Sequence, residues 1–212
     1  MNKFYILIPL IFCLNIHYSS QEEFKINFSI EYNLTKELEH KRSKLPIEMV
    51  IYTKEGFSKK EETTELGSQT LINNFNNNES YLLMEIKNEK LAIKLQTKNK
   101  SNSIKEKISY LNETKNIVGY KCKKAILNTY DVNEEEANTI ELFYTNEIKG
   151  FFDVKFQNIN GFPLQYALES NGMRIIYTAS NIEVKKMNIK TFEIPDNYKV
   201  LSMNQFQQMM LH

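Results

Sequence analysis

Hydrophobic and polar residues alternate strictly between residues 24 and 34. Every second residue from Phe24 to Leu34 is apolar, and the residues between them are polar or charged. A period of two is typical of a strand with one buried face. Further strand-like segments follow at residues 48–53, 70–72, 81–86, 90–95, 108–111, 118–127, 140–145 and 182–187. Helical periodicity is scarce, and only residues 205–211 predict a short closing helix.

Residues 161–180 predict a hairpin that specifies its own register. Asn171-Gly172 suits a two-residue type I′ turn, which needs φ > 0 at both positions. This turn places four pairs on one face of the sheet: Ser170 with Met173, Leu168 with Ile175, Tyr166 with Tyr177, and Leu164 with Ala179. On the other face it pairs Glu169 with Arg174, Ala167 with Ile176, and Gln165 with Thr178. A slip by one residue would disrupt both sets.

The pattern as a whole predicts a mainly β protein, α+β at most. We expect a single curved antiparallel sheet or half-barrel of about eight to eleven strands, with few short helices covering its concave face. Loops or exposed connections are expected at residues 36–44, 73–78, 97–107, 112–116 and 131–138. The charged residues 59–62 are interpreted as a solvated edge strand, and residues 192–198 are expected to turn the chain away.

Composition narrows the class of protein. The chain has 212 residues, a formal net charge of +1 and 42% hydrophobic residues, which suits one globular domain. This charge balance argues against nucleic acid as a partner, because binding phosphate requires clustered Lys and Arg.

Residues 1–20 resemble a cleaved signal peptide. Lys3 precedes an apolar run from Phe4 to Leu14 that is too short to span a membrane. We therefore predict an exported protein without a stable transmembrane anchor, in the periplasm or associated with the outer membrane, with residues 21–212 as a single domain. Lipidation at Cys13 is disfavoured, because Ile11 and Phe12 are bulky where a lipidation site has small residues.

No pattern in the mature chain predicts catalysis. His40 and His212 are isolated, so neither a metal site nor another cofactor site is expected. The acidic residues come in runs that alternate between the two faces of a strand, so they are interpreted as solvated surface. Cys122 is expected to be a small buried residue, although neighbouring lysines would suit a reactive thiol. We predict that the protein is not an enzyme.

Four segments, at residues 48–56, 117–124, 159–166 and 192–199, together carry a family resemblance. They resemble exported bacterial envelope proteins of unknown function whose domain has a GFPL strand followed by FEIP and a tyrosine. That family is similar to the lipoprotein-carrier (LolA/LolB-like) half-barrels and to GLPGLI-type proteins. The resemblance implies a curved sheet around a helical plug, with an apolar concave face that receives acyl chains in the carriers. It implies no catalytic residues.

Two functions follow from this interpretation. The first is an envelope binding protein that holds a lipid, a lipoprotein acyl chain or another apolar ligand on its concave face. Its candidate lining residues are Phe28, Ile30, Tyr32, Leu164, Tyr166, Leu168, Ile175 and Tyr177. All eight could equally be ordinary core. The second is a non-catalytic structural or protein-interaction module that binds another envelope protein through an edge strand. An open apolar cavity would favour the first, and a filled core with a long bare edge the second.

Overall fold

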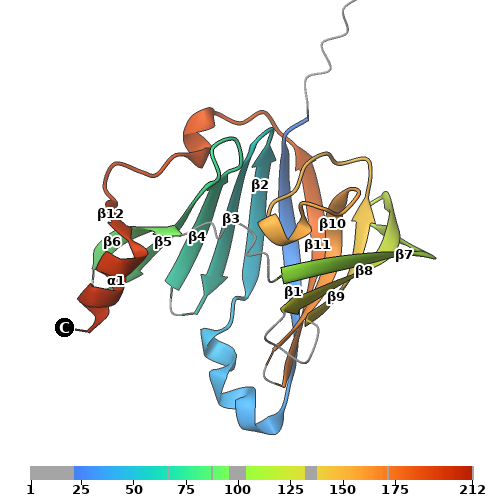
Figure 1. The fold of residues 1–212 in the computed structure, drawn as a ribbon, viewed down its shortest axis with the longest axis horizontal. Coiled ribbons are helices and arrows are strands. Elements are labelled where there is room, and N and C mark those ends of the chain that lie inside the picture. The colour runs from blue at the N-terminus through green and yellow to red at the C-terminus, as the bar shows by residue number, and fades with distance from the viewer. Residues whose placement is uncertain are drawn as a thin grey trace, which may run out of the picture.

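A computed structural model describes residues 22–211 apart from 66, 87, 96–103, 132–137 and 171. The predicted signal peptide and Cys13 lie outside the described residues. In this described part of the chain, twelve strands form one sheet, in the order β12-β6-β5-β4-β3-β2-β1-β11-β10-β9-β8-β7. The sheet is curved and open, with β12 and β7 at its edges (Figure 1). The predicted mainly β class is therefore confirmed.

The strands and helices have the following bounds. The strands are β1 (Phe24–Leu34), β2 (Glu48–Lys54), β3 (Phe57–Thr64), β4 (Gly67–Asn74), β5 (Glu79–Ile86), β6 (Glu89–Leu95), β7 (Ile104–Ile117), β8 (Tyr120–Asp131), β9 (Asn138–Thr145), β10 (Phe162–Ser170), β11 (Met173–Val184) and β12 (Lys199–Ser202). The helices are the 3-10 segments η1 (Lys36–Lys44), η2 (Val154–Phe156) and η3 (Ile189–Phe192), and the α-helix α1 (Met203–Met210).

The β10–β11 hairpin has the predicted register. Tyr166 pairs with Tyr177 and Leu168 with Ile175, while Gln165 pairs with Thr178 on the other face. The two tyrosine rings stack with centroids 4.7 Å apart. Arg174 and Glu169 form the expected ion pair, with 2.6 Å between Nη1 and Oε1. Asn171 lies outside the described residues, and Gly172 has the left-handed φ of +75° that the turn requires.

Several segments differ from the sequence expectations, and residues 104–107 of the expected connection 97–107 already belong to β7. Residues 112–116 do not form a loop, because β7 continues through them to Ile117 with an irregular register between Tyr110 and Thr114. An edge strand has one side free of partners, so such a polar stretch can stay extended there. Residues 199–202 add β12, which pairs with β6 in parallel beyond the segment expected to turn the chain away. Residues 59–62 were expected on an edge strand, but β3 lies inside the sheet between β2 and β4.

The two faces of the sheet carry different cover. On the convex face, the C-terminal segment crosses β3 to β5, where Ile194 and Tyr198 pack on a small cluster that includes Ile72 and Leu83. On the concave face, residues 146–161 between β9 and β10, which we call the plug, lie over β1, β11 and β10 (Figure 1). The cover of this part of the concave face is thus a loop with one 3-10 turn.

Candidate functional site

The plug fills one half of the concave face with aromatic side chains. Phe152 and Phe156 are both buried, with ring centroids 5.3 Å apart. Phe152 lies 6.2 Å from the ring of Phe28 on β1, and Phe156 lies 5.1 Å from the ring of Tyr166 on β10. These contacts join strands at the centre of the sheet to the plug, so this half of the concave face is packed core.

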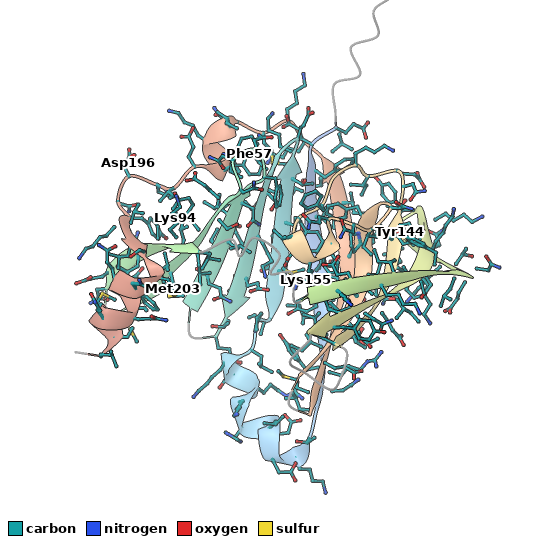
Figure 2. All side chains as sticks on the ribbon, viewed as in Figure 1. Phe57, Lys94, Tyr144, Lys155, Asp196 and Met203 are labelled. Atoms are coloured by element: carbon teal, nitrogen blue, oxygen red, sulfur yellow. The ribbon has the colours of Figure 1, made fainter. Side chains whose placement is uncertain are left out.

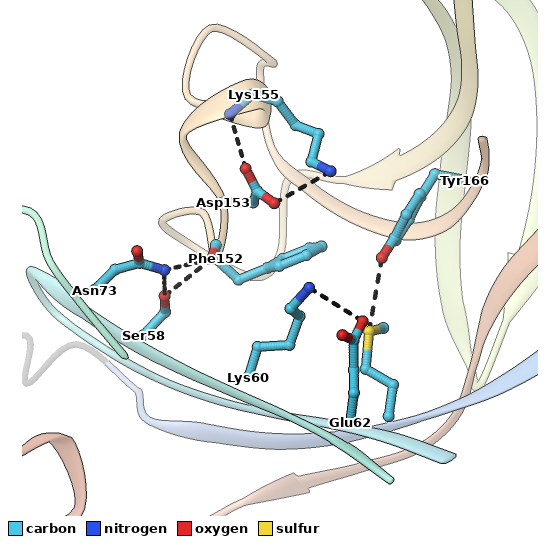
Figure 3. Close-up of polar contacts among 9 residues, drawn as sticks. Ser58, Lys60, Glu62, Asn73, Phe152, Asp153, Lys155 and Tyr166 are labelled. Carbon is cyan, nitrogen blue, oxygen red and sulfur yellow. Dashed lines mark hydrogen bonds and ion pairs between the residues drawn. The ribbon is translucent and has the colours of Figure 1, made fainter. Parts of the chain in front are cut away.

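Polar side chains of the sheet hold the plug in place. Ser58 Oγ donates to the carbonyl oxygen of Phe152 at 2.9 Å, and Asn73 Nδ2 donates to the same oxygen at 3.3 Å (Figure 3). Ser80 Oγ donates to Asn73 Oδ1 at 2.7 Å. All three side chains are buried on neighbouring strands, β3, β4 and β5. A loop carbonyl that faces the sheet therefore has fixed partners in an otherwise apolar layer.

The eight predicted lining residues share the concave face, and they divide into two groups. Phe28, Leu164, Tyr166 and Tyr177 are buried beneath the plug. The others are only partly buried: Ile30, Tyr32, Leu168 and Ile175. Tyr32 lies at the end of the sheet near η1, where its hydroxyl donates to the carbonyl oxygen of Pro46 at 2.6 Å.

A charged group that the sequence interpretation assigned to solvent lies on the concave face. Lys60 and Glu62 of β3 alternate with the neighbouring residues and share a face with the buried Ile51 and Met49 of β2. Glu62 is only 8% exposed, with Oε1 3.1 Å from Lys60 Nζ. Gln69 Nε2 of β4 donates to Glu62 Oε2 at 3.0 Å. We call Lys60, Glu62 and Gln69 the polar cluster.

Connectivity was the signal that could have revealed this cluster. The Glu55-Gly56 turn pairs β3 with β2, and β4 follows β3 at once, so both sides of β3 have partners. In an interior strand of a sheet that is covered on both faces, alternate charged residues must point into the concave layer.

Several tyrosines face the polar cluster. Burial is the largest cause of a raised pKa at Tyr32, Tyr166 and Tyr177, and the negative charge of Glu62 adds to it in each case. The pKa of Tyr32 rises to about 12. The three hydroxyls therefore stay protonated at neutral pH. That of Tyr32 donates to Pro46, and that of Tyr166 donates to Met49 Sδ at 3.7 Å.

The other half of the concave face, over β4 and β5, is less covered. Leu71, Leu82 and Met84 point to the concave side and are only partly buried. A hollow of ≈ 730 Å³ opens at the ends of β4 and β5. Its wall holds Gln69, Met84 and Ile86 from the concave face and Ser68, Glu85 and Tyr198 from the convex side, so it reaches around the end of the sheet. Pro46 also lines it, and the carbonyl oxygen of Pro46 accepts the hydrogen bond from Tyr32. We call this space the end hollow. In the view of Figure 2, Lys155 of the plug and Met203 of α1 lie on either side of β4.

The described residues offer little other chemistry. Among them no group of His, Cys, Asp and Glu is arranged to hold a metal ion. Within the same part of the chain, no helix is long and apolar enough to cross a membrane. Cys122 is buried, and burial raises the pKa of its thiol to about 11. Its thiol is therefore protonated at neutral pH, which matches the expected role as a small core residue.

The fold is a curved open sheet with a plug over part of its concave face. Solved structures with a similar course include the lipoprotein LppX of Mycobacterium tuberculosis, with a TM-score of 0.40, 7% identity, and coverage of 78% of this chain and 88% of that one. A LolA superfamily protein of Nitrosomonas europaea has a TM-score of 0.38, 10% identity, and coverage of 84% and 92%. LprF of Mycobacterium bovis has a TM-score of 0.35, 9% identity, and coverage of 84% and 90%. The second of these structures bears the name of the LolA superfamily, to which the sequence resemblance also pointed.

The sequence itself identifies the family. Residues 46–207 match the family described as N-glycanase peptide, N-terminal domain. The chain belongs to this family. No curated protein matches the chain. The family match covers β2 to β12 and most of α1, so it includes the plug, the polar cluster and the lining of the end hollow apart from Lys44.

Proposed function

We propose that this chain is an exported binding protein of the cell envelope that holds a lipid, an acyl chain or another apolar ligand on its concave face. The observation that carries the proposal is the partly buried apolar surface of Leu71, Leu82 and Met84 beside the end hollow. A hollow of ≈ 730 Å³ is within the usual range of small-molecule sites. The proposal includes removal of residues 1–20 and a single domain from residue 21 onward.

The predicted lining residues divide between two roles in this proposal. Phe28 and Tyr166 support the plug from beneath, because their rings contact Phe152 and Phe156. Tyr32 and its partly buried neighbours extend the apolar surface toward the end hollow. An acyl chain gains about 0.8 kcal/mol for each buried CH₂, so an apolar surface suffices for binding and no catalytic motif is needed.

A binding assay with a matched control tests the proposal. Leu82→Asn introduces a polar group on the concave face of β5, and Val200→Asn makes the same class of change on β12 at a residue that is 54% exposed. Burying a leucine is worth about 1.5–3 kcal/mol, so L82N should weaken uptake of a fluorescent fatty acid by about tenfold or more. V200N should bind as the native protein does. Equal affinity in both variants, or no uptake by the native protein, would contradict the proposal.

The second candidate is a structural or protein-interaction module. The observation in its favour is β7, an edge strand from Ile104 to Ile117 with exposed Tyr110 and Leu111. This strand also carries several lysines and an irregular register, features by which edges avoid pairing with other chains. We therefore place this candidate second. If native mass spectrometry of the mature protein detects no bound ligand, the interaction module becomes the preferred candidate.

The family's description names an N-glycanase, and for this chain we propose binding without glycan release. Glu62, a buried acid of the concave face, is ion-paired with Lys60 and accepts from Gln69, an arrangement that suits a polar binding cluster. Incubation of the mature protein with an N-glycosylated glycoprotein should leave the glycan attached, as judged by mass spectrometry. Release of glycan in an amount equal to or greater than that of the protein would overturn the assignment as a non-enzyme.

A further inference from the structure

Strand β3 carries two Lys–Glu pairs, one on each face of the sheet. Lys59 and Glu61 lie on the convex face, with 2.7 Å between Nζ and Oε1. Lys60 and Glu62 lie on the concave face at 3.1 Å, with side chains only 19% and 10% exposed. The concave pair is the more buried, so it bears the larger desolvation penalty. A leucine and a methionine would fill the same layer without that cost.

The polar cluster borders the apolar surface of the proposed site. Gln69, which donates to Glu62, also lines the end hollow, and its cross-strand neighbour on β5 is Met84. Lys60 is the cross-strand neighbour of Leu71. Figure 3 shows Lys60 and Glu62 rising from the sheet toward the space below Phe152 and Tyr166. A ligand lying on Leu71 and Met84 would therefore have one end against charged and amide groups.

We propose that the ligand is an amphiphile with an uncharged, hydroxyl-bearing head, and that Lys60, Glu62 and Gln69 bind that head. This inference rests on the proposed binding function and specifies its ligand class. A carboxylate head near Lys60 would also meet the carboxylate of Glu62, and an ammonium head near Glu62 would meet Lys60. A hydroxyl can donate to Glu62 and accept from Lys60 without adding a charge to a cluster that is already balanced. The cluster thus selects by repelling both kinds of charged head.

Three probes with the same alkyl chain test the head preference. Dodecyl glucoside has a hydroxyl-bearing head, dodecanoate an anionic head and dodecyltrimethylammonium a cationic head. We expect calorimetry below the micelle concentration to show that the glucoside binds about tenfold more tightly than either charged probe.

Matched double variants show whether the cluster is responsible. In K60M/E62L both partners of the concave pair become apolar, a change that usually preserves folding, and the preference for the glucoside should disappear while tail binding remains. K59M/E61L makes the same change on the convex face of the same strand and should keep the preference. If K60M/E62L fails to fold, E62Q keeps the side-chain shape and should raise the affinity for dodecanoate by about tenfold, because it removes the opposing charge.

The outcomes separate this inference from the function on which it rests. Equal binding of all three probes, or tightest binding of a charged probe, would overturn the head preference and leave the apolar site in place. If the preference for the glucoside persists in K60M/E62L, the polar cluster does not determine it. The same conclusion follows if the preference persists in E62Q, where that variant is tested instead. Failure of all three probes to bind would overturn the binding function itself.

Discussion

Asn73 should be worth several kcal/mol to the fold, because it connects the sheet to the plug. Its amide nitrogen donates to Ser58 Oγ at 3.0 Å and to the Phe152 carbonyl oxygen at 3.3 Å, and its amide oxygen accepts from Ser80 at 2.7 Å. Asn73→Ala removes all three hydrogen bonds at a site that is 3% exposed. At about 1 kcal/mol each, the free energy of unfolding should fall by about 3 kcal/mol.

Urea unfolding followed by circular dichroism measures this loss. The midpoint should move to lower urea with an unchanged slope, and the Tm should fall by about 6–12 °C for a domain of this size. Asn128→Ala is the control, because Asn128 accepts a solvent-exposed hydrogen bond from Thr139 at 2.7 Å and its loss should cost less than about 0.5 kcal/mol. If both variants lose the same small amount, the plug is not held by these side chains.

Three further predictions concern the backbone, the thiol and alkaline pH. Gly161→Ala should lower the free energy of unfolding by more than about 1 kcal/mol, because the added Cβ would lie 2.3 Å from the Thr145 carbonyl oxygen. Gly119→Ala is the control: its Cβ would meet open space, so denaturant titrations should show a loss of only about 1 kcal/mol. Cys122, with its raised pKa of about 11, should react with a thiol reagent at pH 8 only after unfolding; rapid labelling of the native protein would contradict its burial. The pKa of Tyr32 is about 12 in the folded protein, against an ordinary value of 10.0. Its contribution to stability is therefore complete below about pH 10 and is lost as the pH rises to about 12. The free energy of unfolding should fall across that window, and it should fall less steeply in Tyr32→Phe.

Much of the fold could be predicted from local sequence pattern. The β10–β11 register follows from one Asn-Gly turn and from alternation, and both act between residues close in the chain. The closing helix was expected at residues 205–211 and is observed at Met203–Met210, where Ser202 and Gln205 form a capping box. These features depend on few long-range contacts.

The candidate site depended on contacts that local pattern does not contain. Lys60 and Glu62 resemble solvated residues until β2 and β4 are paired on both sides of β3. The plug has no periodicity, and Phe152 and Phe156 are buried only because the curved sheet surrounds them. Alternation correctly placed Tyr166 and Tyr177 on the concave face, but it could not show that the plug covers them.

Native mass spectrometry of the mature protein, purified from its own envelope with minimal detergent, tests the central claim most directly. We predict a reproducible added mass that matches a lipid or an acylated molecule. The L82N variant should lose this added mass, and the V200N variant should retain it. A mass without any bound molecule, together with no uptake of a fluorescent fatty acid, would contradict the account and favour the protein-interaction role.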